Sequence, residues 1–191
     1  LSKPLKTLCD LDILEREVPP TEKNIETSKK GQYRIKDNFL AFWFRFVYPM
    51  RSFIESDHPE IAMTKLKTGF IPNHVGYVYE DICRQKMWEL NAQGKLPFLF
   101  DRVGRWWGGK DTEIDIVAID TTDRSKIIFG ECKFHQNVPM QLSELHQLKE
   151  KAAVVPWGNA NRDEYFALFC ISGYSEDLQQ LAQEDSHLLL M

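Results

Sequence analysis

The segment 113–134 constrains the fold more than any other part of the sequence. It contains two apolar, β-branched runs, Glu113-Ile-Asp-Ile-Val-Ala-Ile-Asp120 and Ile127-Ile-Phe-Gly-Glu-Cys-Lys-Phe134, which are typical of strands. The polar residues 123–125 lie between these runs and suit a turn. The sequence therefore predicts an antiparallel hairpin over this segment.

Charged residues lie at the ends of these two predicted strands. Because alternate residues of a strand share a face, Glu113 and Asp115 point one way, and so do Glu131 and Lys133. If the pairing brings these faces together, three carboxylates and one ammonium converge beside apolar residues, where unpaired charges are costly. A divalent cation with oxygen ligands, such as Mg²⁺, would offset the carboxylate repulsion. The alternative is a set of solvated strand-end charges and a surface Glu-x-Lys pair, which stabilises little.

Composition indicates a folded protein without an overall positive field. The chain has 191 residues, of which 43% are hydrophobic, enough for one large core or two small ones. Its net charge of −4 argues against tight non-specific binding of nucleic acid. The four separated cysteines are typical of reduced, packed thiols and not of a zinc site. With no membrane-spanning stretch and no signal peptide, we expect a cytoplasmic protein without a membrane partner.

Residues 1–56 have the pattern of a partial winged helix-turn-helix and an aromatic linker helix. The predicted elements are a helix over 4–14, strands over 14–18 and 32–36, and a helix over 39–54. In this interpretation Lys23, Lys29 and Lys30 lie on the wing and contact DNA phosphates. The alternative is a hairpin that serves only for packing. The last helix is apolar nearly all round, so we expect it to be buried.

Residues 57–191 have the pattern of an α/β domain. The predicted elements are helices over 59–68, 74–91, 139–154 and 175–184, and strands over 98–107, 113–120, 127–134, 165–172 and 187–191. Asn73 is a candidate helix cap, and Pro139 suits a first helical turn. Glu80 lies near the edge of an apolar helical stripe, where it either reaches the hairpin or is an ordinary flanking residue. The pair Trp106-Trp107 is interpreted as a lid over the sheet or as a base-stacking pair.

This order of elements, with acids and a lysine on the central strands, resembles the PD-(D/E)xK nuclease superfamily. Its core is restriction-endonuclease-like: a helix, three antiparallel strands, a helix and a further strand. A closer resemblance is to the C-terminal region of a prokaryotic, chiefly archaeal, family of AAA-type ATPases, in which a winged helix precedes a nuclease-like domain of unknown function. The strings that carry it lie at 30–49, 79–83, 104–108, 113–118 and 130–133.

The resemblance implies roles for individual residues. Asp115 and Glu131 would be metal-binding carboxylates, and the main-chain carbonyl of Cys132 would add a ligand. Lys133 would orient a water molecule or stabilise charge on the phosphate. Glu80 would support the same metal or a second one. Glu113 would be an accessory acid on the same strand.

The implied activity is metal-dependent hydrolysis of DNA phosphodiester bonds, with Mg²⁺ or Mn²⁺ as the cofactor. No Gly-x-x-x-x-Gly-Lys-[Ser/Thr] loop occurs in the chain. We therefore expect a C-terminal part of a longer protein, with ATP bound only in a preceding ATPase domain. The expected partners are DNA and that ATPase domain, and copies of the chain could associate. The alternative is a catalytically silent nuclease-fold module for DNA docking or protein interaction.

Overall fold

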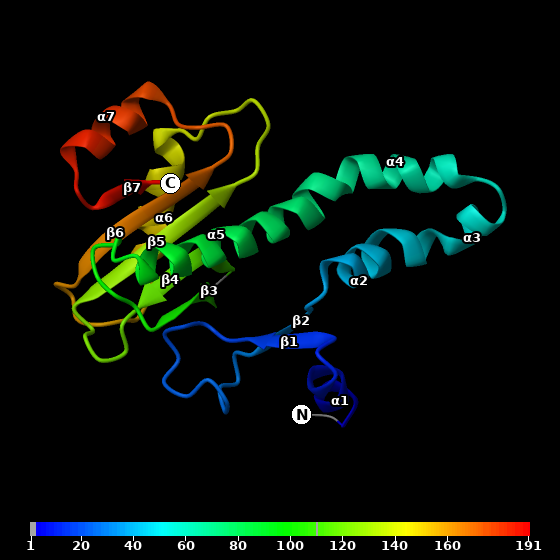
Figure 1. The fold of residues 1–191 in the computed structure, drawn as a ribbon, viewed down its shortest axis with the longest axis horizontal. Helices are drawn as coiled ribbons and strands as arrows, with labels where there is room; N and C mark the ends of the chain where they lie inside the picture. The colour runs from blue at the N-terminus through cyan, green and yellow to red at the C-terminus, as the bar shows by residue number, and fades with distance from the viewer. Residues whose placement is uncertain (1–2, 110) are drawn as a thin grey trace. The chain divides into compact units, whose positions relative to one another are not determined.

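The computed structural model describes residues 3–109 and 111–191 and forms two compact units (Figure 1). Unit 1 comprises residues 3–17 and 31–78, and unit 2 comprises residues 18–30 and the described residues from 79 onward. The sequence predicts a division between residues 56 and 57, whereas the chain passes between the compact units at 17/18, 30/31 and 78/79.

Unit 1 begins with a short helix and an antiparallel hairpin, and continues as a run of helical segments. Its elements are α1 (Lys3–Asp10), β1 (Leu14–Glu17), β2 (Gln32–Ile35), α2 (Asn38–Phe42), η1 (Trp43–Val47), η2 (Tyr48–Met50), α3 (Arg51–Glu55), α4 (Pro59–Phe70), η3 (Ile71–Val75) and the start of α5 (Gly76–Ala92). The first and last pairs of the hairpin are Leu14↔Ile35 and Glu17↔Gln32. The predicted helix and hairpin before residue 37 are thus confirmed as elements.

The aromatic segment 39–54 is not the buried helix that its composition predicts. Asp37 caps it, because its side chain accepts a hydrogen bond from the Leu40 N–H at 2.8 Å. The segment then passes through α2, the π-helical η1, η2 and α3, and Met50 is its one buried residue. Phe39 and Tyr48 are 65% and 55% exposed. The burial prediction is wrong because only one side of the segment packs, with rings of Phe42 and Phe46 against those of Phe70 and His74.

The helical run from α4 to α5 is continuous, so Asn73 does not cap a new helix. Asn73 lies inside the π-helical turn η3, between α4 and α5. Pro72 lacks the N–H that an α-helix needs at this point. The wider π-helical turn accommodates the proline without ending the helix, which explains why the predicted boundary is absent.

Unit 2 is a mixed α/β domain built on a five-stranded sheet. Its strands are β3 (Arg102–Gly108), β4 (Thr112–Ile119), β5 (Lys126–Lys133), β6 (Asp163–Cys170) and β7 (Leu188–Leu190), and they neighbour one another in that order. β3, β4 and β5 pair antiparallel, whereas β6 pairs parallel to β5 and β7 pairs parallel to β6. The predicted order of a helix, three strands, helix, strand, helix and strand is confirmed.

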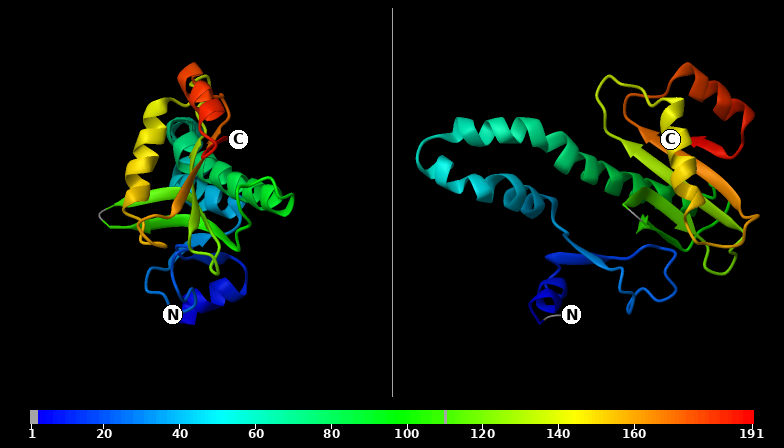
Figure 2. Two further views of the ribbon diagram at one scale, coloured as in Figure 1. Left: turned by 90° about the vertical axis from the view of Figure 1, so that its left-hand side faces the viewer. Right: turned by 180° about the vertical axis from the view of Figure 1, so that it is seen from behind.

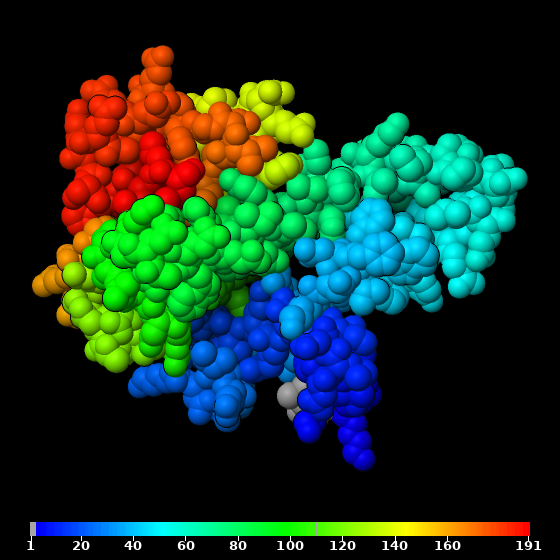
Figure 3. Space-filling model, in the orientation of Figure 1, coloured from blue at the N-terminus to red at the C-terminus, as the bar shows by residue number. Residues whose placement is uncertain are grey.

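Helices cover both faces of this sheet (Figure 2). Ile127 and Phe129 belong to a core with α6 (Leu142–Ala153) and α7 (Glu176–Glu184), whereas Ile128 and Cys132 belong to a core with α5. Alternate residues of β5 therefore face opposite helices, which explains why this strand is apolar on both sides. The outward-facing side chains of α5 form part of the surface of unit 2, drawn in green in Figure 3.

Residues 18–30, the predicted wing, belong to unit 2 and are held by side chains of β3. Trp106 Nε1 donates to Thr21 Oγ1 at 3.1 Å, and Trp107 Nε1 donates to the Lys30 carbonyl oxygen at 3.1 Å. Arg102 donates to the Glu22 carbonyl oxygen at 2.9 Å. The paired tryptophans thus anchor this segment through their indole N–H groups.

Two further features complete the description of unit 2. α6 begins at Leu142 because Gln141 and Glu144 form a capping box, so Pro139 lies outside the helix that it was predicted to start. None of the helices in the described residues is long and apolar enough to cross a bilayer.

Candidate active site

A bulge in β4 positions Asp115. The pairs Gly104↔Val117 and Trp106↔Ile114 set two steps of β3 against three steps of β4, so the extra residue lies in the stretch that carries Asp115. Bulges re-aim side chains and end strand pairing locally. The pairing of β4 with β5 is described as far as Ile116↔Gly130, just before Asp115.

A glycine allows the strands to approach closely at this point. A Cβ on Gly130 would lie 2.9 Å from Cβ of Ile116 and 3.1 Å from the carbonyl oxygen of Ala167. Both distances are too short for a well-packed side chain. Gly130 therefore lets β4, β5 and β6 come together immediately before Glu131, Cys132 and Lys133.

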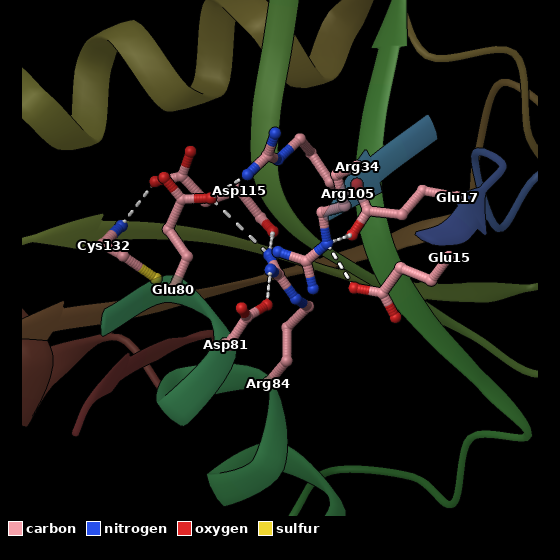
Figure 4. A network of polar contacts seen from close by, with 9 residues as sticks. All are labelled: Glu15, Glu17, Arg34, Glu80, Asp81, Arg84, Arg105, Asp115 and Cys132. Carbon is pink, nitrogen blue, oxygen red and sulfur yellow. Dashed lines mark hydrogen bonds and ion pairs between the residues drawn. The ribbon is translucent and has the colours of Figure 1, made fainter. Parts of the chain in front are cut away.

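The carboxylates of Glu80 and Asp115 lie side by side (Figure 4). Burial, together with the neighbouring carboxylates of Glu131 and Glu80, raises the pKa of Asp115 to about 7. The main-chain N–H of Cys132 opposes this by donating to Asp115 at 2.8 Å. Burial also raises the pKa of Glu80, although Arg105 beside it favours the ionised form.

Two arginines neutralise the acids of α5 (Figure 4). Arg105 donates to Glu80 at 2.7 Å, and Arg84 lies 3.6 Å from the same carboxylate oxygen. Arg84 also binds Asp81 and donates to the main-chain oxygen of Asp115 at 3.0 Å. Arg84 is buried, so it links α5 to β4 through polar contacts inside the domain.

The Glu131 carboxylate is held by two lysines. Lys133 donates to Oε1 at 2.6 Å, and Lys151 of α6 donates to Oε2 at 3.1 Å. Glu131 is only 5% exposed, so its charge requires such partners. Burial works to lower the pKa of Lys133, but the adjacent Glu131 charge and hydrogen bond outweigh it, and the pKa is raised. Lys133 is therefore a cation at neutral pH.

The cluster as a whole balances its charges. Its members are the acids Glu80, Asp81, Asp115 and Glu131 and the bases Arg84, Arg105, Lys133 and Lys151. Within residues 3–109 and 111–191, no three His, Cys, Asp or Glu side chains are gathered so as to hold a metal ion. Mg²⁺, however, is usually bound by one or two carboxylates together with waters and substrate phosphates. The adjacent oxygens of Glu80 and Asp115 fit that requirement.

The structure places the other predicted site residues differently. Glu113 is exposed on β4, and no described hydrogen bond or ion pair joins it to the cluster. Cys132 contributes its N–H to Asp115, while its side chain is buried in the core against α5. On the segment 18–30, Lys23 and Lys29 are exposed, and Lys30 pairs with Glu22 at 2.8 Å.

Sequence reasoning missed three of the basic residues. Arg84 lies four residues after Glu80 on α5, a spacing that favours ion pairs and could have identified it. Arg105 directly precedes the pair Trp106-Trp107, and nothing in the local sequence marks it as a partner of Glu80. Lys151 gave no local signal, because it lies 20 residues after Glu131 and reaches it only through the packing of α6.

Comparisons with known proteins place the cluster within a recognised family region. A family model, DUF234, described as "Archaea bacterial proteins of unknown function", matches residues 43–152. "Uncharacterized protein MJECL04" of Methanocaldococcus jannaschii is 35% identical over 165 residues, which cover 86% of this chain and 36% of that protein. The chain thus spans about a third of this relative's length. No solved structure matches the chain.

Proposed function

Because the chain belongs to the archaeal and bacterial DUF234 family of unknown function, we propose a function from the chemistry of its cluster. The function is metal-dependent hydrolysis of phosphodiester bonds in DNA, with Mg²⁺ or Mn²⁺ as the cofactor. The observation that carries this proposal is the pair of adjacent carboxylates, Glu80 and Asp115, beside the Glu131–Lys133 ion pair. Carboxylates beside a lysine match the needs of a reaction at a phosphate.

Each residue has a distinct role in this proposal. Asp115 and Glu80 would hold the cation, and Glu131 would join them when its lysine partners allow. A bound cation would supply an activated water and would neutralise charge on the phosphate. Lys133 would donate hydrogen bonds to the attacking water or to the phosphate oxygens. The Cys132 N–H keeps the Asp115 carboxylate in place through its 2.8 Å hydrogen bond.

The proposal extends to the superfamily and to the rest of the protein. The order α5, β3, β4, β5, α6, β6 supports a PD-(D/E)xK nuclease core, with the acids on β4 and β5. We further propose that this region acts beside an AAA-type ATPase domain, where ATP would bind. Its support is the sequence resemblance over 30–49 and the shorter strings. Cleavage by a protein that includes that domain would then depend on ATP.

A second candidate is a catalytically silent module that docks DNA or a protein. The observation that favours it is the pairing of the acids with internal cations. Lys133 and Lys151 occupy both oxygens of Glu131, and Arg105 occupies Glu80. A structural cluster of this kind would need no metal.

The test compares nicking of supercoiled plasmid and cleavage of single-stranded and branched DNA in Mg²⁺, Mn²⁺ or EDTA. The variants are Asp115→Asn and Lys133→Met, with Glu113→Gln as the matched control because it removes an exposed acid from the same strand. If the protein is a nuclease, the wild type and Glu113→Gln cut DNA, and Asp115→Asn and Lys133→Met do not. Equal cutting by all four proteins would contradict it. DNA retardation without any cutting would support the silent module.

A further inference from the structure

We propose that Lys151 competes with the metal for Glu131: its ammonium occupies the carboxylate until a divalent cation displaces it. This inference rests on the proposed metal-dependent function, and it concerns the regulation of the same site. It assigns to Lys151 a role in setting how strongly the site binds its cation. Lys151 is a positioning residue in this account, because it acts through Glu131.

Each carboxylate oxygen of Glu131 already holds an ammonium group. Oε1 accepts from Lys133 at 2.6 Å and Oε2 accepts from Lys151 at 3.1 Å. The Glu131 side chain is 7% exposed, so it cannot turn to solvent for another partner. A cation that takes either oxygen as a ligand comes close to an ammonium group, and the repulsion between these like charges favours displacement of one of the two lysines.

Lys151 is the partner that can leave. Lys133 lies two residues from Glu131 on the same strand and makes the shorter contact. Lys151 reaches the carboxylate from a different element, α6, and over the longer distance, while the exposures of the Lys151 and Lys133 side chains are similar. The flexible stem of Lys151 can carry the ammonium to water at little cost. Once displaced, it would lie at the rim of the site, where a substrate phosphate could attract it.

Removing the competitor should therefore strengthen metal binding. In Lys151→Met, Glu131 keeps Lys133 as its partner, and a cation no longer has to break a charge-assisted hydrogen bond. We expect the variant to bind Mn²⁺ about tenfold more tightly than the wild type, the change that corresponds to losing one such contact. Lys151→Arg keeps the ion pair, so its affinity should stay close to that of the wild type.

Lys149→Met is the matched control. Lys149 lies on the same helix and carries the same charge, but its ammonium packs over the Phe166 ring at 5.2 Å and does not contact Glu131. A general effect of lowering the positive charge on α6 would appear equally in both methionine variants. A specific effect would appear only in Lys151→Met.

The experiment is calorimetric titration of the 191-residue chain with Mn²⁺, with circular dichroism to establish that each variant is folded. Tighter binding by Lys151→Met alone supports the inference, and so does binding by this variant when the wild type binds none. If the wild type binds Mn²⁺ and Lys151→Met binds it equally tightly or more weakly, the inference is overturned but the proposed function is not. Absence of binding in both proteins would overturn both.

Discussion

Cys132 donates its main-chain N–H to Oδ2 of Asp115 at 2.8 Å, just beyond Ile116↔Gly130, the last described pair of β4 and β5 at this end. The carboxylate thus takes a hydrogen bond at the end of the ladder between β4 and β5, in the stretch of β4 that carries the bulge against β3. Arginines pair with Glu80, whereas burial and the neighbouring acids outweigh the Cys132 N–H and the Lys133 charge at Asp115, so its pKa is raised. The stability of unit 2 should therefore depend on the ionisation of Asp115.

Asp115→Asn should stabilise the protein at pH 8 in EDTA by about 1–3 kcal/mol. The pKa of Asp115 rises from 3.8 to about 7 on folding, so the folded state holds the proton more tightly. The free energy of unfolding of the wild type should therefore fall as pH rises from about 4 to about 7, whereas asparagine cannot ionise. Denaturant unfolding at pH 5 and pH 8, followed by tryptophan fluorescence, measures this difference.

Asp120→Asn is the control for this prediction. The pKa of Asp120 is lowered, mainly by hydrogen bonds from Thr122, so ionisation of Asp120 favours the folded state at neutral pH. Its replacement should not stabilise the protein at pH 8. If the free energy of unfolding falls with rising pH as steeply in Asp115→Asn as in the wild type, the role given to Asp115 is contradicted. Addition of Mg²⁺ should stabilise the wild type more than Asp115→Asn.

The sequence predicted most of the elements and the acids because these signals are local. The strands around Asp115 and Glu131 were readable from short apolar runs, and Glu80 from its place on a helical stripe. The bulge in β4 was not readable, because it depends on how β3 pairs with β4. The same holds for Lys151, whose contact with Glu131 depends on where α6 packs.

Arg84→Met should destabilise unit 2 by about 3 kcal/mol, because it removes one partner of a buried charge network. Arg84 is 9% exposed and contacts Glu80, Asp81 and the main-chain oxygen of Asp115. The methionine would leave these acceptors without their shared donor. Urea unfolding at pH 7.5 gives the free energy of unfolding for the comparison.

Lys86→Met is the control on the same helix. Lys86 pairs with Glu89 at 2.8 Å, but both side chains are more than half exposed. Exposed pairs of this kind contribute roughly 0–1 kcal/mol. Similar losses for Lys86→Met and Arg84→Met would show that the buried network adds nothing beyond a surface ion pair.

Gly130→Ala should destabilise the sheet by about 1–3 kcal/mol through overpacking. The added Cβ would lie 2.9 Å from Ile116 and 3.1 Å from the Ala167 carbonyl oxygen, and backbone oxygens cannot move aside as a flexible side chain can. Gly76→Ala is the contrast, because the nearest atom to its added Cβ is at 3.6 Å within a helix. There alanine should stabilise by about 0.5–1 kcal/mol. Thermal unfolding that ranks the two variants in the opposite order would refute this account of Gly130.

The aromatic segment 39–54 shows where composition misleads. Its apolar residues occur on all sides, which normally indicates a buried helix. In unit 1, Phe42 and Phe46 pack against Phe70 and His74, whereas Phe39 and Tyr48 remain exposed. Composition reports how apolar a helix is, but not how many of its sides have a neighbour.

Trp106→Phe should loosen residues 18–30 without unfolding the sheet. Phenylalanine keeps most of the buried ring, but it removes the indole N–H that donates to Thr21 Oγ1 at 3.1 Å. Trypsin should then cut after Lys23 and Lys29 several times faster than in the wild type, because proteolysis follows local opening.

Trp88→Phe is the matched control for this change. Trp88 is 45% exposed, and its ring packs at a tilt against Phe100, with 4.8 Å between the ring centroids. None of its described ring contacts is with residues 18–30. Its replacement should leave the cutting rate at Lys23 and Lys29 unchanged. Equal rates in Trp106→Phe and the wild type would mean that the remaining anchors, Trp107 and Arg102, hold the segment by themselves. The double variant Trp106→Phe/Trp107→Phe separates these cases, because it removes both indole donors while the Arg102 contact to the Glu22 carbonyl oxygen persists.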